Sequence, residues 1–307
     1  MPVNKVLNLD LAWINSIQVN DAEIKSKVAT AKFVDPKLVS ENVTPAAIKN
    51  VVGVIDLASL IGTETPDSIA ELCKKATSPM SEADGAVKVA KDPSLHCAAV
   101  CVYPARIEDA IKSLKSLGAD KSVVVAAVAA GFPSGAYPLQ TRLAEVSYAV
   151  SAGAQEIDVV IDRSLVLRGL WQQLYEELVQ IRKACGETTL KVILSVTECA
   201  NFTNIYKASA VAMLAGADFI KTSTGKEAVT MSLNEGLVMC YAIKDFYNRT
   251  GVKVGLKPAG GVRTPETAIN WLLMVKGELG PEWADPKLFR IGTTVLKVYA
   301  DYLNNAK

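Results

Sequence analysis

The sequence predicts a (β/α)8 barrel, or TIM barrel, with a helical extension at its N-terminus. From about residue 50 onward, eight short runs of apolar and β-branched residues alternate with segments of helical apolar spacing. Near-continuous apolar strands separated by helices are typical of parallel strands buried on both faces. Eight such strand–helix units match a closed barrel. An open doubly wound sheet is the alternative, but the GxGxxG turn of that fold is absent after the first run.

Length and composition agree with this fold class. The 307 residues have room for two domains, although one barrel of about 250 residues plus an extension fits equally well. Hydrophobic residues make up 50% of the chain and charged residues 21%, as in a soluble globular protein with a large core. The formal net charge of +1 gives no global field that favours nucleic acid or an anionic membrane. Since no N-terminal signal segment and no apolar run of about 18 residues occurs, we expect a cytoplasmic protein without a membrane partner.

The first part of the chain differs from the alternating region. Residues 1–48 are predicted to form the helical extension, and residues 49–307 the barrel. Segments 9–19 and 22–33 carry helical apolar spacing and no pattern typical of a catalytic site. We expect the extension to pack on the barrel, either as a structural part or as a contact between two copies in a homodimer.

The predicted strands place the residues that follow them at one end of the barrel. The eight strands are 51–57, 97–103, 122–130, 155–161, 189–196, 217–222, 252–257 and 288–293. Helical spacing is clearest at 107–119, 143–154, 206–217 and 267–279. The active site of such a barrel lies at the C-terminal ends of its strands, so residues that end strands are the candidates for chemistry.

Two lysines end neighbouring strands. Lys221 ends the sixth strand before a Thr-Ser-Thr-Gly-Lys turn, and Lys257 ends the seventh strand before Pro and two glycines. Two ammonium groups in one site repel each other, which lowers the pKa of one lysine and favours its neutral form. A neutral lysine amine is a nucleophile for carbonyls and the basis of Schiff-base catalysis. The pair therefore indicates a site for imine chemistry.

Carboxylates are predicted inside the same barrel. Asp158 lies between apolar neighbours on the fourth strand, where an unpaired carboxylate is costly to bury, so it should meet a lysine or an ordered water. A structural ion pair that holds the barrel interior is an equal alternative. Asp56, at the end of the first strand, has the same two interpretations. Lys191 lies near the start of the fifth strand and is predicted to face the bottom of the barrel as a structural residue.

Glycine turns follow the last three strands, at 222–226, 259–263 and 291–294. Loops after the seventh and eighth strands of such barrels commonly bind phosphate through backbone N–H groups and a helix N-terminus. Lys226 and Arg263 add positive charge there, and arginine can contact phosphate through two nitrogens. The turns indicate a phosphorylated small molecule. The first of them is not a P-loop, because Glu227 stands where Ser or Thr must follow the lysine.

Cysteine and histidine usage argues against metal chemistry. The six cysteines are scattered, form no CxxC pair and are expected to be buried thiols. Because His96 is the single histidine, a His-based zinc or iron site is not expected, and we predict no metal and no cofactor.

Six segments carry a resemblance to a known family. They are AAVCVYPAR (98–106), AAGFPSG (129–135), EIDVV (156–160), DFIKTSTGK (218–226), KPAGGVRT (257–264) and LFRIG (288–292). In these segments the sequence resembles the deoxyribose-phosphate aldolases, in the longer form with an N-terminal helical extension. The segments extend through nearly the whole chain from about residue 50, and the two lysine motifs are highly specific for these Schiff-base aldolases.

The resemblance implies a role for each matching residue. Lys221 is implied to form the imine with the donor aldehyde, Lys257 to be the ammonium that depresses its pKa, and Asp158 to carry protons through water. The positions that match the phosphate side are Gly225, Lys226, Gly260, Gly261, Val262, Arg263, Gly292 and Thr294. The implied reaction is the reversible, metal-independent cleavage of 2-deoxy-D-ribose 5-phosphate to acetaldehyde and D-glyceraldehyde 3-phosphate.

Departures from the family pattern gather around the site. Ala58-Ser59 replaces a Thr-Thr pair after Asp56, and Val196-Thr197 replaces Thr-Gly after the fifth strand. One hydroxyl of a pair after the eighth strand is lost, since Thr294 is followed by Val295, and the tail that ends in tyrosine has no clear counterpart. We expect an acceptor side altered toward aldehydes without phosphate. The residues predicted to line it are Asp56, Cys101, Thr197 and Val295.

Two other functions fit parts of the pattern. One keeps the imine chemistry with another aldol donor or acceptor. The other is a catalytically silent barrel that binds a sugar phosphate as a regulator. Lys221, Lys257 and Asp158 together favour an enzyme, because binding alone does not require a lysine with a depressed pKa.

Overall fold

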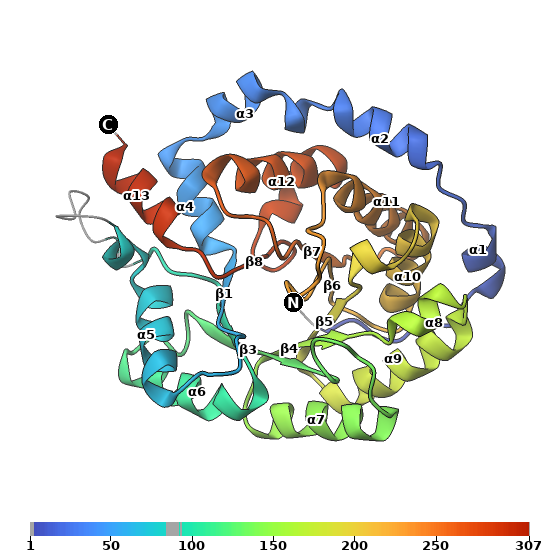
Figure 1. Cartoon of the computed structure of the whole chain (residues 1–307), viewed down its shortest axis with the longest axis horizontal. Helices are drawn as coiled ribbons and strands as arrows, with labels where there is room; N and C mark the ends of the chain where they lie inside the picture. Colours follow the sequence, from blue (N-terminus) through green and yellow to red (C-terminus); the bar gives the residue numbers. More distant parts are fainter. Residues whose placement is uncertain (1–2, 84–91, 93, 307) are drawn as a thin grey trace.

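The computed structural model describes residues 3–83, 92 and 94–306 and has the predicted barrel architecture (Figure 1). Neighbouring strands pair in parallel in the order β7-β6-β5-β4-β3-β2-β1-β8. Parallel bridges from Leu256 to Phe289 and from Ala259 to Gly292 join the two ends of this order. The strands are β1 Ile55–Ala58, β2 Ala99–Val102, β3 Val124–Ala129, β4 Glu156–Val160, β5 Thr189–Ile193, β6 Phe219–Lys221, β7 Gly255–Lys257 and β8 Ile291–Thr293.

The helices that follow the strands form the outer ring (Figure 1). Local sequence sets their ends: Ser232 and Glu235 make a capping box at the start of α11, and Gly251 ends that helix with a φ of +69°. Thr264 and Thr267 make a second capping box at α12, just after the glycine turn that follows β7. The ring comprises α5 Pro66–Thr77, α6 Ile107–Ser116, α7 Leu139–Ser151, α8 Arg163–Leu167, α9 Trp171–Cys185, α10 Phe202–Leu214, α11 Leu233–Thr250, α12 Pro265–Glu278 and α13 Lys297–Asn305.

Short 3-10 turns connect several of these elements. Among the described residues they are η1 Lys32–Val34, η2 Pro79–Glu82, η3 Pro104–Arg106, η4 Val196–Glu198 and η5 Pro281–Ala284. The turn η4 stands directly after β5, at the end of the barrel where chemistry is expected.

The first predicted strand, 51–57, begins later than its apolar pattern suggested. Residues 51–53 form the last turn of α4 Pro45–Gly53, and β1 starts at Ile55. The helix is specified by Thr44, whose hydroxyl accepts from the N–H of Ala47, and by Pro45 at its first position. A run of buried valines fits a helix face and a strand equally, so the N-terminal cap determines that residues 51–53 are helical.

The N-terminal extension is helical and lies against the barrel's outer helices. The helices α1 Leu11–Ser16, α2 Asp21–Ala29 and α3 Pro36–Asn42 run around the outside of α10, α11 and α12 (Figure 1). Ahead of them, the backbone N–H of Asn4 donates to Asp218 Oδ1 over 2.7 Å, which fixes the N-terminal segment across the base of β6. The predicted division at residue 48 falls inside α4, which leads directly into β1.

The barrel interior is divided into an apolar part and a charged part. Small and branched residues fill the side formed by β2, β3 and the upper ends of β4 and β5; they are Ala99, Cys101, Ala126, Val128, Val160 and Ile193, covered by Leu60 and Phe132. Charged residues fill the rest. Within the described residues no helix has both the length and the apolar character needed to cross a membrane.

Candidate active site

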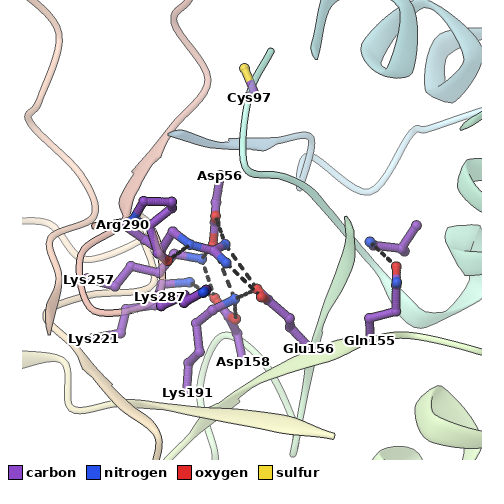
Figure 2. A network of polar contacts seen from close by, with 12 residues as sticks. Asp56, Cys97, Gln155, Glu156, Asp158, Lys191, Lys221, Lys257, Lys287 and Arg290 are labelled. Atoms are coloured by element: carbon purple, nitrogen blue, oxygen red, sulfur yellow. Dashed lines mark hydrogen bonds and ion pairs between the residues drawn. The ribbon is translucent and has the colours of Figure 1, made fainter. Parts of the chain in front are cut away.

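Seven charged side chains meet inside the barrel, joined by ion pairs into one network that can be followed in Figure 2. None of them is more than 7% exposed to solvent. They point inward because side chains alternate along a strand, so that residues two apart share the interior face. The seven are Asp56, Glu156, Asp158, Lys191, Lys221, Lys257 and Arg290.

Asp158 is the acceptor that joins the lysines. Its Oδ2 lies 2.7 Å from the Nζ of Lys221 and 2.7 Å from the Nζ of Lys257. Lys221 and Lys257 are directly paired in the register of β6 and β7, so both ammonium groups enter the interior at one level. The structure thus brings together the three residues to which the sequence assigned catalysis.

The lower part of the network binds the same carboxylate from the other side. Lys191 donates to Asp158 Oδ1 over 3.0 Å and contacts Asp56 Oδ2 at 3.2 Å and Glu156. Lys191 is therefore fully buried and paired, as a structural lysine should be, but it is not separate from the lysine pair. Its position near the start of β5 suggested that it faces the bottom of the barrel, whereas its register partner is Asp158 itself.

The charges of this network balance without Lys221. Three carboxylates, Asp56, Glu156 and Asp158, stand against the cations of Lys191, Lys257 and Arg290. Lys221 is a fourth cation, and its ion pair among the described residues is to Asp158, which two other lysines share. Loss of a proton from Lys221 therefore leaves a neutral buried cluster, which is the cheaper state in a medium of low polarity.

The pKa values of the two upper lysines shift in opposite directions for this reason. Burial lowers the pKa of Lys221, and the neighbouring Lys257 lowers it further against the opposing effect of Asp158. Burial also disfavours the ammonium of Lys257, but Asp158 and Asp56 together raise its pKa above the ordinary value. Of the two lysines, Lys221 is therefore the one that gives up its proton more readily, and Lys257 the one that keeps it.

A pocket of about 130 Å³ opens above the two lysines at the C-terminal ends of the strands. It extends from the lysines to the three glycine turns, so one space connects the amine to the backbone N–H groups. All eight residues predicted for the phosphate side line it, with Asp56 and Cys101: Gly225, Lys226, Gly260, Gly261, Val262, Arg263, Gly292 and Thr294.

The glycines of the second turn are required by backbone geometry. Gly260 and Gly261 have φ values of +79° and +80°, which side chains on L-residues disfavour. A Cβ on Gly261 would also lie 2.4 Å from Thr230 Cγ2. Beside them, Thr222 Oγ1 accepts from the N–H of Ala259 and donates to its carbonyl oxygen, which ties the ends of β6 and β7 together.

Glu227 supports the first turn, a role that the sequence interpretation missed. Its Oε1 accepts from Ser195 Oγ and from the N–H of Thr224, both over 2.8 Å, and its Oε2 accepts from the N–H of Gly225. Burial raises the pKa of Glu227, but the hydrogen bonds from Thr224 and Ser195 lower it below the ordinary value, which favours the charged carboxylate. The sequence offered only a carboxylate after a Gly-Lys pair, which distinguishes this turn from a P-loop but predicts no partner.

Two residues predicted to line the site, Thr197 and Val295, are not among those that line this pocket. Ser195 has a φ of +51°, and in the turn η4 that follows Thr197 is half-buried and its hydroxyl donates to the Val229 carbonyl oxygen. Val295 is not among the pocket-lining residues; its N–H donates to Thr293 Oγ1. The structure does not bring either side chain to the lysines.

Cys101 lines the pocket but is protected as a thiol. It ends the apolar side of the interior and is 1% exposed. Burial raises its pKa, and the negative charge of Asp158 raises it further against the nearby lysines. Because the thiolate is the reactive form, a buried thiol with a raised pKa is a poor nucleophile.

The fold and the site define a barrel enzyme with buried lysines at the C-terminal mouth. Residues 54–277 match the DeoC/LacD family of aldolases. The chain is 48% identical over 293 residues to deoxyribose-phosphate aldolase from Homo sapiens, covering 95% of this chain and 91% of that one. It is 49% identical over 288 residues to the enzyme of the same name from Mus musculus, covering 94% and 89%.

A solved structure agrees in fold. Deoxyribose phosphate aldolase from Aeropyrum pernix has a TM-score of 0.65 and 20% identity to this chain, covering 88% of this chain and 99% of that one. The chain belongs to the DeoC/LacD family of aldolases. It is a carbon–carbon lyase, and the resemblance seen in its motifs is confirmed.

Proposed function

We propose that the protein is a class I aldolase that reversibly cleaves 2-deoxy-D-ribose 5-phosphate to acetaldehyde and D-glyceraldehyde 3-phosphate. The observation that carries the proposal is the shared contact of Asp158 Oδ2 with Lys221 and Lys257, at 2.7 Å each. It places a lysine with a lowered pKa, a lysine with a raised pKa and a carboxylate in one buried site. The names of the relatives suggest the substrate.

The arrangement supports each proton transfer of an imine mechanism. The Lys221 amine adds to the C1 carbonyl of the open-chain sugar, and loss of water from the carbinolamine gives the imine. Proton loss from the C3 hydroxyl then breaks the C2–C3 bond, which releases glyceraldehyde 3-phosphate and leaves an enamine. Protonation of the enamine carbon and hydrolysis release acetaldehyde and restore the amine. Asp158 is the group in contact with both lysines, so we assign it the relay of protons to and from the reacting atoms.

The glycine turns are proposed to bind the phosphate. Lys226 and Arg263 lie at the rim of the pocket, where their charges meet an incoming anion. Backbone N–H groups near Gly260 and Gly261 stand just before the N-terminus of α12, which favours negative charge. We further propose a cytoplasmic enzyme that acts on small molecules, and that two copies pair as a homodimer.

Borohydride trapping with acetaldehyde tests the mechanism. Reduction should leave an ethyl group on the peptide that contains Lys221, found by peptide mass mapping, because the imine is fixed as a secondary amine. The adduct should disappear in Lys221→Ala and persist in Lys49→Met, a surface lysine outside the barrel interior. A folded wild-type protein without an adduct at Lys221 would favour the silent sugar-phosphate-binding barrel instead.

The acceptor side is tested by comparing deoxyribose 5-phosphate with deoxyribose. The pocket retains its glycine turns and both cations, and the position that lost a hydroxyl, Val295, does not line it. We therefore expect kcat/KM to favour the phosphorylated sugar. Lys226→Met should lower kcat/KM for that sugar about tenfold or more, since a charge-assisted contact contributes ~1.5–3 kcal/mol, and should leave deoxyribose unchanged. Equal rates on both sugars in the wild type would instead indicate an acceptor side altered toward unphosphorylated aldehydes.

A further inference from the structure

The floor of the barrel holds an ion pair that lies outside the pocket. Arg290 precedes β8, and its guanidinium contacts Glu156 through two nitrogens, at 2.8 and 3.1 Å. Its Nη1 also donates to Asp56 Oδ1 over 2.6 Å. Burial disfavours this charge, but Asp56 and Glu156 raise the pKa of Arg290 still higher, so the guanidinium is permanently positive.

Two short paths connect this ion pair to the amine. One runs from Arg290 through Asp56 to Lys257 and then to Asp158. The other runs from Glu156 through Lys191 to Asp158 Oδ1. Both paths end on the carboxylate that contacts Lys221. Removing a charge from Arg290 or Glu156 therefore changes how strongly Asp158 is bound by the other cations and how much it stabilises the ammonium form of Lys221.

The N-terminal segment covers the floor from below. Val3 and Asn4 line a small cavity beside Arg290, Glu156 and Phe219. The Asn4 side chain donates to the carbonyl oxygens of Ala217 and Lys253, at 3.0 and 3.2 Å. Because this segment is fixed by three hydrogen bonds, the ion pair remains largely removed from water, and its charges are weakly screened.

We propose that Arg290 and Glu156 are positioning residues of the reaction: they fix the charge balance of the barrel interior, so that Lys221 is the lysine left without a carboxylate of its own. The inference rests on the proposed imine chemistry. It assigns to the floor a role in setting which lysine is the nucleophile, although neither residue borders the reacting atoms.

The groups that act on Lys221 come from nearly every strand. The residues that change the pKa of Lys221 most are Asp158 on β4, Lys257 on β7 and Cys101 on β2. Behind them stand Asp56 on β1 and Lys191 on β5, and Lys226 and Arg263 lie at the pocket rim. The inward residues of β3 are Ala126 and Val128, which carry no charge. A charge change at Arg290 or Glu156 therefore shifts the pKa of Lys221 while the other charged groups around it stay the same.

Opposite charge changes should have opposite effects. Arg290→Gln removes a cation, leaves the interior with surplus negative charge and makes Lys221 hold its proton more strongly. Since the neutral amine is the reactive form, the acidic limb of kcat/KM should move up by ~0.5–1 pH unit. Glu156→Gln removes an anion and should move the same limb down by a similar amount. The double variant, whose charge balance is restored, should lie within ~0.3 pH unit of the wild type.

The experiment measures kcat/KM against pH for the three variants and for Arg290→Lys, which keeps the charge and should leave the limb in place. The rate of borohydride-trapped acetaldehyde adduct, measured over the same pH range, gives a second readout. If the acidic limb moves in the same direction in Arg290→Gln and Glu156→Gln, or moves in neither, the inference is overturned. The proposed function is unaffected by that result as long as borohydride traps an adduct in the wild type. If Arg290→Gln fails to fold, the downward shift of Glu156→Gln and its cancellation in the double variant decide the question. Absence of an adduct in the wild type would instead overturn the proposed function.

Discussion

Lys257→Met is expected to lower kcat/KM at pH 7 by about tenfold or more and to move its acidic limb upward. Methionine fills a similar volume without charge, so the ammonium that helps to lower the pKa of Lys221 is lost. Asp158 also loses one of its three lysine partners, which makes it a stronger partner for Lys221. Both changes raise the pKa of Lys221 and reduce the fraction of neutral amine. At a pH below that pKa, a rise of about one pH unit in the pKa lowers this fraction about tenfold.

The measurement is kcat/KM from pH 6 to pH 10 in Lys257→Met and in Lys49→Met. Activity of Lys257→Met should recover in part at the alkaline end, where Lys221 is again neutral, while the surface variant follows the wild type. Two carboxylates lose a buried partner, so a loss of ~3–5 kcal/mol in the free energy of unfolding is also expected. An unchanged pH profile in a folded variant would contradict the role of Lys257.

Asp158→Asn is expected to reduce kcat by ~100- to 10,000-fold, the usual range for a lost general acid–base group. Asparagine retains the shape and one carbonyl oxygen, but it cannot take a proton from the amine or return one to the enamine. Loss of the carboxylate also removes the effect that opposes proton loss at Lys221. The amine should therefore stay neutral and available, so imine formation and turnover should respond differently.

Parallel trapping and steady-state assays separate the two steps. Borohydride should still give the adduct in Asp158→Asn, more slowly than in the wild type, while the turnover of deoxyribose 5-phosphate falls through the stated range. Asn304→Ala, near the C-terminus and away from the network, serves as a control at another buried polar residue. Turnover within tenfold of the wild type would show that another group carries the protons.

The sequence was sufficient for the fold and for the upper part of the site. Alternation of apolar runs with helical spacing predicted the eight strands, and the position of Lys221 and Lys257 at strand ends predicted that they meet. The first strand was predicted to begin too early because Val51 and Val52 fit a helix face as well as a strand. That error concerned a boundary, where local caps outweigh hydrophobic pattern.

The lower part of the site required the closed barrel. Arg290 contacts Glu156 and Asp56, which lie 134 and 234 residues away in the sequence, so no local spacing predicts these pairs. Lys191 was predicted as structural from its place in the strand, but only the register of β4 against β5 reveals that it shares Asp158. Thr197 was placed at the site by its match to a motif, but it follows a left-handed Ser195 and is not among the residues that line the pocket.

The divided barrel interior has a consequence for redesign. Leu60 and Cys101 of the apolar side line the pocket beside Lys221, whereas the charged side holds Asp158 and Lys257, the residues proposed to move protons. The interior side chains of β2 and β3 are uncharged, whereas β4 and β5 carry charged residues as well as Val160 and Ile193, so the pocket is best reshaped from the side of β2. Smaller residues at Leu60, which lines the pocket and belongs to the apolar side, are expected to enlarge the space beside Lys221 without replacing a charged residue.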